Sequence, residues 1–348
     1  MSEEFREILK ARARGPEHLG PLDPELCERA MGLILAGEAT PAQIGGFLLV
    51  GRAAGDSPEE LVAYARGMEP FVRQLEVAPG PAPVTISGGF DGKVRTLNTG
   101  VAASLVAAAA GAQVLMIGCE NTPPKLGRTV FDAMRGLGVP EMGSLDEAGV
   151  SLEEHGFAAV GTQHYLPGLH DLLGLRWEMA RRTVLNVLEK ILSPIRNSPF
   201  VVGVSHRPFL KSVAEALAKL GNEHALVVQA IEGSDEAPLD GTSSLVRVRP
   251  GGIQEQSVQP ESLGLPRTTR AHVPWKGARD EAGRVLEALD GRQGPVRNLL
   301  VYNAALRLWT ADESAPLEEH AEKARSVLDT GEALDLLARL RNPATVCS

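Results

Sequence analysis

The sequence has few cysteines, few aromatic residues and no long apolar run, and each shortage excludes a class of protein. Its 348 residues include only three cysteines, which are widely spaced and form neither a Cys-x-x-Cys motif nor a Cys/His cluster. This set predicts neither a disulfide framework nor a zinc site, and it favours a reducing, cytoplasmic location. No stretch approaches the roughly 18 consecutive apolar residues of a membrane span, and the charged start of the chain is unlike a signal peptide, so we expect neither membrane insertion nor export.

Positive charge is also in the minority. The chain has 35 Lys and Arg against 44 Asp and Glu, which gives a formal net charge of −9, and 4% of its residues are aromatic. Nucleic-acid or phosphate binding would therefore need a local basic patch, because the overall field repels polyanions. The scarcity of aromatic stacking platforms is a second observation against single-strand binding.

What is present predicts a small helical domain followed by a larger one. Segments that begin at Pro24, Pro41 and Pro58 each follow a capping residue and carry apolar side chains at helical spacing. We assign residues 1–76 to an N-terminal helical domain, the Pro/Gly-rich stretch VAPGPAP at 77–83 to a linker, and residues 84–348 to the second domain.

The second domain alternates strands with helices. This rhythm predicts the α/β class, with a mostly parallel central sheet flanked by helices. We expect a hairpin over Ser243–Val258, and three helices beginning near Gly277, Pro295 and Pro316; helices near 170–193 could pack with the helical domain. The expected strands are Val84–Ser87, Gln113–Ile117, Phe157–Gly161, Phe200–Val204 and Ala225–Ala230, and the expected helices between them are Thr99–Gly111, Gly127–Leu137, Leu145–His155, Leu175–Leu192 and Pro208–Leu220.

Three glycine-bearing loops follow predicted strands. They are SGGFDGKVR at 87–95, GCENTPPKLG at 118–127 and EGSDEAPLDG at 232–241. The carboxyl ends of parallel strands are where open α/β sheets place ligands. Basic residues in the first two loops and acidic residues in the third are consistent with a phosphate site facing a metal-binding pair, and equally with an ordinary solvated rim.

Four blocks of sequence resemble one known family. They are PAQIGGFLLVGRAAGDSPEELVAYARGM, SGGFDGKVRTLNTGVAASLVAAAAGAQVLMIG, LRWEMARRTVLNVLEKILSP and the GSDE turn. In order and spacing they resemble the anthranilate phosphoribosyltransferases, a glycosyltransferase family 3 group that shares its fold with nucleoside phosphorylases. The resemblance spans about residues 5 to 335. It implies a cleft between two domains, a homodimer built through the helical domain, binding of phosphoribosyl pyrophosphate with Mg²⁺, and displacement of pyrophosphate by an aromatic amine.

The resemblance also assigns roles to individual residues. Arg176 matches the arginine that binds the carboxylate of the aromatic acid, and Asp235 and Glu236 match the acidic metal pair, a donor set that suits magnesium. Lys93 and Arg95 add positive charge beside the phosphates. The other implied substrate-binding residues are Gly88, Gly89, Asp91, Gly92, Asn98, Gly118, Lys125 and Gly127.

The chain departs from the family pattern at the donor loop. Ser87 and Phe90 stand where two of the family's glycines belong, and Gly100 replaces a serine that would assist the metal. Pro123 and Pro124 replace phosphate-binding serines. Because of these departures, the chain resembles a divergent branch of the anthranilate phosphoribosyltransferase-like proteins.

Three hypotheses therefore stand side by side. The first is phosphoribosyl transfer to an aromatic amine such as anthranilate, with an altered donor loop. The second is a catalytically inactive family member that binds single-stranded nucleic acid, and the third is transfer or phosphorolysis on another ribosylated metabolite.

Overall fold

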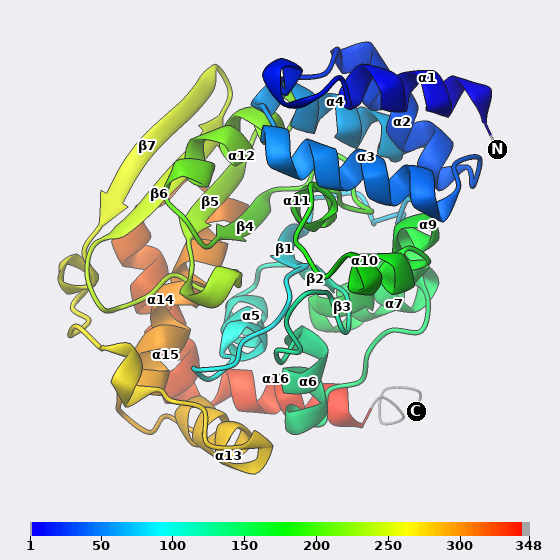
Figure 1. Ribbon diagram of the computed structural model, residues 1–348. Coiled ribbons are helices and arrows are strands. Elements are labelled where there is room, and N and C mark those ends of the chain that lie inside the picture. Colours follow the sequence, from blue (N-terminus) through cyan, green and yellow to red (C-terminus); the bar gives the residue numbers. More distant parts are fainter. Residues whose placement is uncertain (1, 343–348) are drawn as a thin grey trace.

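The computed structural model describes residues 2–342, and its N-terminal part is a helical unit (Figure 1). Asp23, Thr40 and Ser57 accept hydrogen bonds from the first turns of three of its helices, as their positions before proline predict. Thr40 and Ser57 form complete capping boxes. The unit consists of α1 (Glu3–Arg12), α2 (Pro24–Leu35), α3 (Pro41–Ala54) and α4 (Pro58–Met68).

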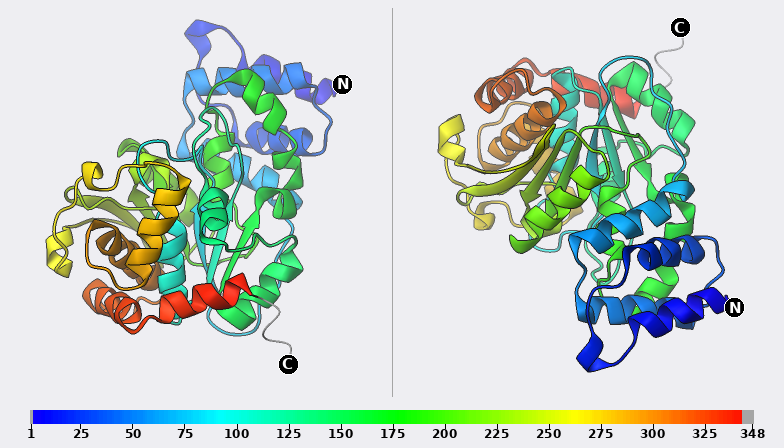
Figure 2. Two further views of the ribbon diagram at one scale, coloured as in Figure 1. Left: turned by 90° about the horizontal axis from the view of Figure 1, so that it is seen from below. Right: turned by 90° about the horizontal axis from the view of Figure 1, so that it is seen from above.

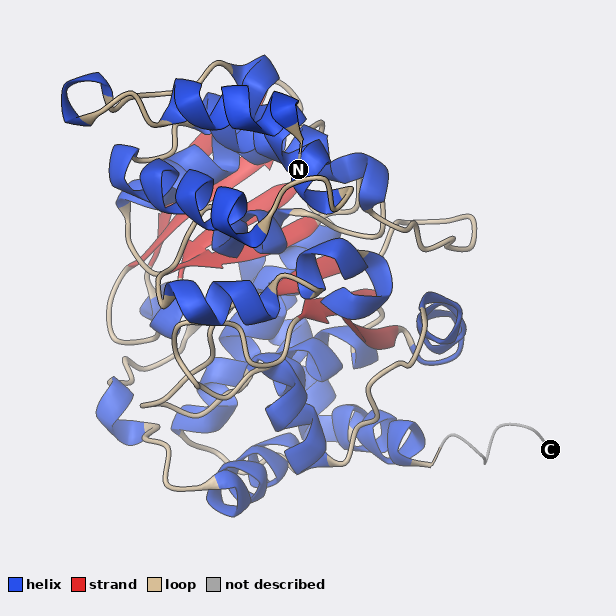
Figure 3. Cartoon of the chain, turned by 45° about the vertical axis from the view of Figure 1, so that its right-hand side comes forward, coloured by secondary structure: helices blue, strands red, loops and turns tan. Residues whose placement is uncertain are grey.

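A seven-stranded sheet forms the centre of the molecule (Figure 3). Its order is β3-β2-β1-β4-β5-β6-β7; β1 to β5 are parallel, and β6 and β7 are the antiparallel hairpin that the sequence predicts. The α/β class and the mostly parallel sheet are thus confirmed. The strands are β1 (Val84–Gly88), β2 (Val114–Gly118), β3 (Phe157–Gly161), β4 (Phe200–Val204), β5 (Ala225–Gln229), β6 (Ser243–Arg249) and β7 (Gly252–Val258).

Helices cover both faces of this sheet, and the hydrophobic core divides by face. Met116 packs with α5, α14 and the C-terminal helices, whereas its neighbours Leu115 and Ile117 pack on the other side with α12 and the helical unit. This is the alternation that a strand imposes on successive side chains. Figure 2 shows the N-terminal and C-terminal helices at opposite ends of the molecule. The helical unit therefore shares one core with a sheet face, although the boundary at 77–83 stays a prediction.

The remaining helices mostly match the predicted positions. They are α5 (Gly100–Ala109), α6 (Val130–Leu137), α7 (Leu145–His155), α8 (Thr162–Tyr165), α9 (Pro167–His170), α10 (Leu173–Met179), α11 (Leu185–Ile191), α12 (Pro208–Lys219), α13 (Ala278–Leu289), α14 (Pro295–Ala311), α15 (Leu317–Thr330) and α16 (Glu332–Arg341).

Two helix predictions were wrong in extent. The helix expected over Leu175–Leu192 is two helices, α10 and α11, because Ala180 adopts a left-handed conformation with φ 53°. The last of the three expected C-terminal helices is also divided, at Gly331, into α15 and α16. The break at Ala180 lets α10 pack against α3 and α11 against α4.

Two of the three cysteines lie within the described residues. Cys27 and Cys119 are free and buried, and Cys347 lies outside the described residues. Between residues 2 and 342, no helix combines the length and apolar character needed to cross a bilayer.

Candidate functional site

Parallel strands bring the three predicted loops to one edge of the sheet. Gly88 and Gly118 are register partners at the ends of β1 and β2, so the loops that follow them start side by side. Gly92, with φ 80°, packs directly on Gly127: a Cβ at Gly92 would lie 2.1 Å from the Gly127 carbonyl carbon. Lys93 and Arg128 then exchange backbone hydrogen bonds of 2.9 and 2.8 Å. The first two loops are thus one backbone unit that requires glycine at the point of contact.

Asp91 is the charged centre of that unit. Its side chain is buried and lies 3.4 Å from Lys125 Nζ, and it also accepts a hydrogen bond from Arg182. The two cations keep contact with solvent, with 29% of the Lys125 side chain and 50% of the Arg182 side chain exposed. They are therefore positioned to bind an anionic ligand at this edge.

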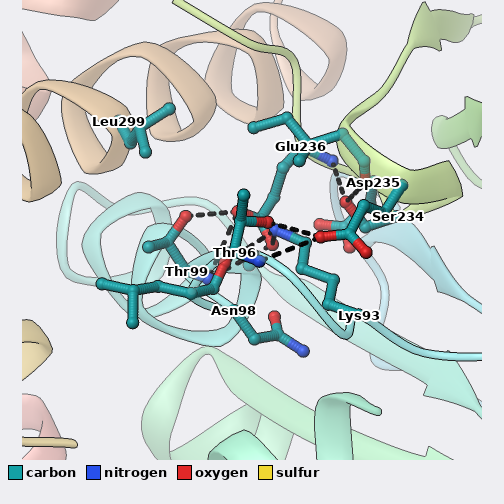
Figure 4. Close-up of polar contacts among 12 residues, drawn as sticks. Lys93, Thr96, Asn98, Thr99, Ser234, Asp235, Glu236 and Leu299 are labelled. Carbon is teal, nitrogen blue, oxygen red and sulfur yellow. Dashed lines mark hydrogen bonds and ion pairs between the residues drawn. The ribbon is translucent and has the colours of Figure 1, made fainter. Parts of the chain in front are cut away.

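Lys93, in contrast, is fully buried. Its Nζ lies 2.7 Å from Oε1 of Glu236 and donates to the Leu97 carbonyl oxygen at 2.9 Å (Figure 4). Glu236 also accepts hydrogen bonds from the backbone N–H of Thr99, at 3.2 Å, and from its hydroxyl. The predicted phosphate-side lysine and the second residue of the predicted metal pair are therefore each other's partners.

Asp235 is paired in the same way, with Arg307 of α14. The two side chains are fully buried and hydrogen-bonded, and burial raises the pKa of Asp235. The guanidinium is held further by Ser104 Oγ at 3.0 Å and the Asn303 carbonyl oxygen at 2.8 Å. A Cβ on Gly100 would meet Asp235 Oδ2 at 3.0 Å, so the glycine that replaces the family's serine makes room for this carboxylate.

Magnesium, which the resemblance implies, does not fit this arrangement. Both carboxylates of the predicted pair, Asp235 and Glu236, already contact a buried cation. Within residues 2–342, no cluster of three His, Cys, Asp or Glu side chains could hold a metal ion. A bound Mg²⁺ would add two positive charges to a buried cluster that is already neutral.

Arg176 is brought to the site through another buried ion pair. Its Nη2 donates to Glu189 Oε2 at 2.9 Å, and Glu189 lies beneath the donor loop: a Cβ at Gly89 would be 3.1 Å from Glu189 Cγ. Two further guanidinium nitrogens, Nε and Nη1, have no hydrogen-bond partner. Arg176 is thus a buried side chain of α10 rather than a surface residue of a long helix.

Glu232 is a site residue that the sequence analysis missed. Its carboxylate accepts hydrogen bonds from the backbone N–H groups of Val94, Arg95 and Thr96 and from the Thr96 hydroxyl, at 2.8 to 3.3 Å. Glu232 thereby fastens the third loop to the first. The acidic character of its loop was visible in the sequence, but nothing there identified three consecutive N–H groups as its partners.

The other predicted residues hold backbone in place. Asn98 donates from Nδ2 to the Thr129 carbonyl oxygen at 3.0 Å, and its own N–H donates to Glu281 at 2.9 Å. Arg95 is mostly exposed and lies 3.6 Å from Glu232. Lys190, also missed, is half-buried beside Phe90 and donates to the carbonyl oxygens of Gly203 and Gly233, and desolvation lowers its pKa to about 8.

Comparison with known proteins covers nearly the whole chain. The family model of the glycosyl transferase family, a/b domain, matches residues 85–334, and its helical bundle domain matches residues 6–69. Anthranilate phosphoribosyltransferase from Thermomicrobium roseum is 33% identical over 324 residues, covering 92% of both chains, and the enzyme from Thioalkalivibrio sulfidiphilus is 31% identical over 317 residues, covering 91% of this chain and 93% of its own.

Solved structures agree on the fold. The anthranilate phosphoribosyltransferase of Thermus thermophilus superposes with a TM-score of 0.83 at 29% identity, covering 98% of each chain. The Saccharomyces cerevisiae enzyme, in complex with phosphoribosyl pyrophosphate and Mg, also gives 0.83 over 98% of each chain, at 18% identity. The chain belongs to the glycosyl transferase family and is an anthranilate phosphoribosyltransferase-like protein.

Proposed function

We propose that this chain binds phosphoribosyl pyrophosphate at the glycine-loop edge of the sheet and transfers its phosphoribosyl group to an aromatic amine such as anthranilate. The observation that carries the proposal is the convergence of Lys125 and Arg182 on Asp91, beside the contact of Gly92 with Gly127. Two partly exposed cations beside the loop that follows β1 suit a diphosphate. The two anthranilate phosphoribosyltransferases compared above, each more than 30% identical over most of the chain, support the reaction class.

The proposed reaction is a displacement at the anomeric carbon of the ribose. The nitrogen of the amine forms a bond to that carbon, the bond from the carbon to the pyrophosphate oxygen breaks, and the amine loses one proton. Lys125 and Arg182 would neutralise the leaving pyrophosphate beside the predicted loop residues Gly88, Gly89 and Gly118. No side chain is needed as a nucleophile.

Arg176 is the proposed contact for the carboxylate of the acceptor. Its Nε and Nη1 atoms lack hydrogen-bond partners, while Nη2 is held by Glu189. The carboxylate of an aromatic acid would accept a hydrogen bond from one of these two nitrogens, beside the pair with Glu189. Arg176→Lys removes that geometry, so we expect the KM for anthranilate to rise by about tenfold or more with little change in kcat.

Calorimetric titration with phosphoribosyl pyrophosphate tests the donor site. Lys125→Met and Arg182→Met are each expected to weaken binding by about tenfold or more. Lys10→Met and Arg6→Met are matched controls, since both side chains lie on the surface of α1 in exposed ion pairs. Absence of binding to the wild-type protein would contradict the proposal.

A homodimer formed through the helical domain and a cytoplasmic location are further parts of this proposal. The homodimer follows from the family resemblance, and the cytoplasmic location follows from the three widely spaced cysteines. Sedimentation velocity would report the dimer, and variants in the helical domain that dissociate it should retain the fold of the α/β domain.

A second candidate function, binding of single-stranded nucleic acid, is favoured by one surface. Trp275, 39% exposed, lies under the Arg128 guanidinium at 4.2 Å from the ring centroid, and its backbone N–H donates to the Arg95 carbonyl oxygen at 2.9 Å. Leu126, next to Gly127, is 77% exposed. An exposed aromatic ring stacked with an arginine is the kind of platform on which bases stack.

Gel-shift titration with a single-stranded oligonucleotide separates this function from the first. Trp275→Ala should weaken binding without changing its salt dependence, whereas Arg95→Ala should reduce the slope of log affinity against log salt by about one. No binding at low salt would exclude the second candidate and leave the first untouched.

A further inference from the structure

The acidic pair and its two cations form one neutral cluster. Asp235 and Glu236 contribute two negative charges, and Arg307 and Lys93 contribute two positive charges at hydrogen-bond distance. Each carboxylate has its own cation, so neither charge is left to attract another ion, although Asp235 Oδ1 has no hydrogen-bond partner.

Moving either cation away to admit a metal would break several buried contacts. All four side chains are shielded from solvent, with 1% or less of each exposed. Arg307 is anchored at three more points, by Ser104, Asn303 and the Gly100 carbonyl oxygen. Lys93 is held by the Leu97 carbonyl oxygen and by its backbone pairing with Arg128. Displacing either one would leave an uncompensated buried charge and break these contacts.

We propose that Lys93 and Arg307 are permanent counter-cations of the Asp235–Glu236 pair and that this pair holds no divalent metal ion. Binding of the donor, which rests on the proposed function, then depends on fixed side-chain cations such as Lys125 and Arg182 rather than on a protein-bound metal. The cluster instead has a structural role, because its ion pairs join the first loop, the third loop and α14.

A Mn²⁺ titration followed by electron paramagnetic resonance tests the metal claim without any ligand. The wild-type protein is expected to leave the signal of free Mn²⁺ unchanged. The double variant Lys93→Met/Arg307→Leu leaves the two neighbouring carboxylates without their cations, and it is expected to gain one Mn²⁺ site and a Mn²⁺-dependent rise in Tm. Adding Asp235→Asn to that variant should abolish both effects.

The wild-type titration decides the claim even if the double variant does not fold. Saturable binding of one Mn²⁺ that disappears in Asp235→Asn would overturn the proposal. The parallel titration with phosphoribosyl pyrophosphate is made in EDTA and in Mg²⁺, and we expect affinities within about tenfold of each other. Binding that needs Mg²⁺ and loses this requirement in Asp235→Asn would also overturn it, whereas no binding in either buffer would refute the proposed function and leave the Mn²⁺ result standing.

Discussion

Lys93 and Glu236 form a buried ion pair, with Nζ and Oε1 2.7 Å apart, between two loops that are far apart in the sequence. Lys93 follows the glycine loop after β1, and Glu236 follows β5. The contact makes the two loops a single rigid edge, because buried charges that are paired and hydrogen-bonded have few alternative arrangements. Contacts within the chain itself therefore hold this edge of the sheet in place.

Arg307→Leu should lower the free energy of unfolding by about 3–5 kcal/mol, because it leaves Asp235 buried beside an apolar side chain. The double variant Arg307→Leu/Asp235→Asn should recover part of this loss. Urea unfolding of the single and double variants measures the coupling. Arg292→Leu, in an exposed pair with Glu287, is the matched control and should change little. Equal effects of Arg307→Leu and Arg292→Leu would contradict the structural role.

Gly92→Ala should disrupt the contact between the first two loops. The residue has φ 80°, and an added Cβ would lie 2.1 Å from backbone of Gly127, which cannot be relieved by a side-chain movement. We expect a loss of at least about 1 kcal/mol in stability and a clear loss of donor binding. Gly241→Ala in the third loop meets no atom within 4 Å and serves as the control in thermal unfolding and calorimetry. Donor binding that survives in Gly92→Ala would argue against this loop as the donor site.

Glu232→Gln should loosen the backbone of residues 94–96. Burial would raise the pKa of Glu232, but hydrogen bonds from Val94, Thr96 and Arg95 outweigh it and hold the pKa below its ordinary value of 4.5. A carboxylate of this kind stabilises the fold above pH 4.5, and the contribution is lost as the pH falls through the lowered pKa. Hydrogen exchange should report faster exchange at these amides in the variant at neutral pH, and unchanged exchange would show that Glu232 does not anchor the loop.

Asp56 gives the helical unit a pH dependence of opposite sign. Burial, together with the Glu60 carboxylate, raises the pKa of Asp56 to about 6. The folded state therefore binds a proton more tightly than the unfolded chain, so this contribution is complete below about pH 4 and is lost as the pH rises through 6.

The variant Asp56→Asn should remove that dependence and gain up to about 3 kcal/mol at pH 7 relative to wild type. Urea unfolding of the wild type and of the variant between pH 4 and 7 measures how the free energy of unfolding of each changes with pH. A variant whose stability falls with pH as steeply as that of the wild type would contradict the assignment to Asp56.

Local sequence signals account for most of the fold. Capping residues before proline, such as Thr40 and Ser57, identified helix starts because a cap and its helix are neighbours in the chain. The break at Ala180 escaped prediction because alanine is a strong helix former, and packing of α10 and α11 against different helices overrides its preference. The position of the three glycine-bearing loops could also be predicted, because the carboxyl ends of parallel strands meet at one edge of the sheet.

The partners within the site could not be predicted in the same way. Arg307 lies inside α14, where an arginine carries no sequence signal for a buried acid, and its pairing with Asp235 depends on how that helix packs against α5. Glu189 and Arg176 face one another only because the predicted single helix is broken between them. The residues were predicted from the resemblance, whereas their contacts are a product of tertiary packing.

The most direct test of the whole account is an anomalous diffraction measurement on crystals of the chain grown with phosphoribosyl pyrophosphate and Mn²⁺. The account predicts ligand density at the Gly92–Gly127 contact, beside Lys125 and Arg182. It also predicts no anomalous peak at Asp235 and Glu236, and an intact ion pair between Lys93 and Glu236. A Mn²⁺ peak between the two carboxylates, with Lys93 or Arg307 displaced, would contradict it.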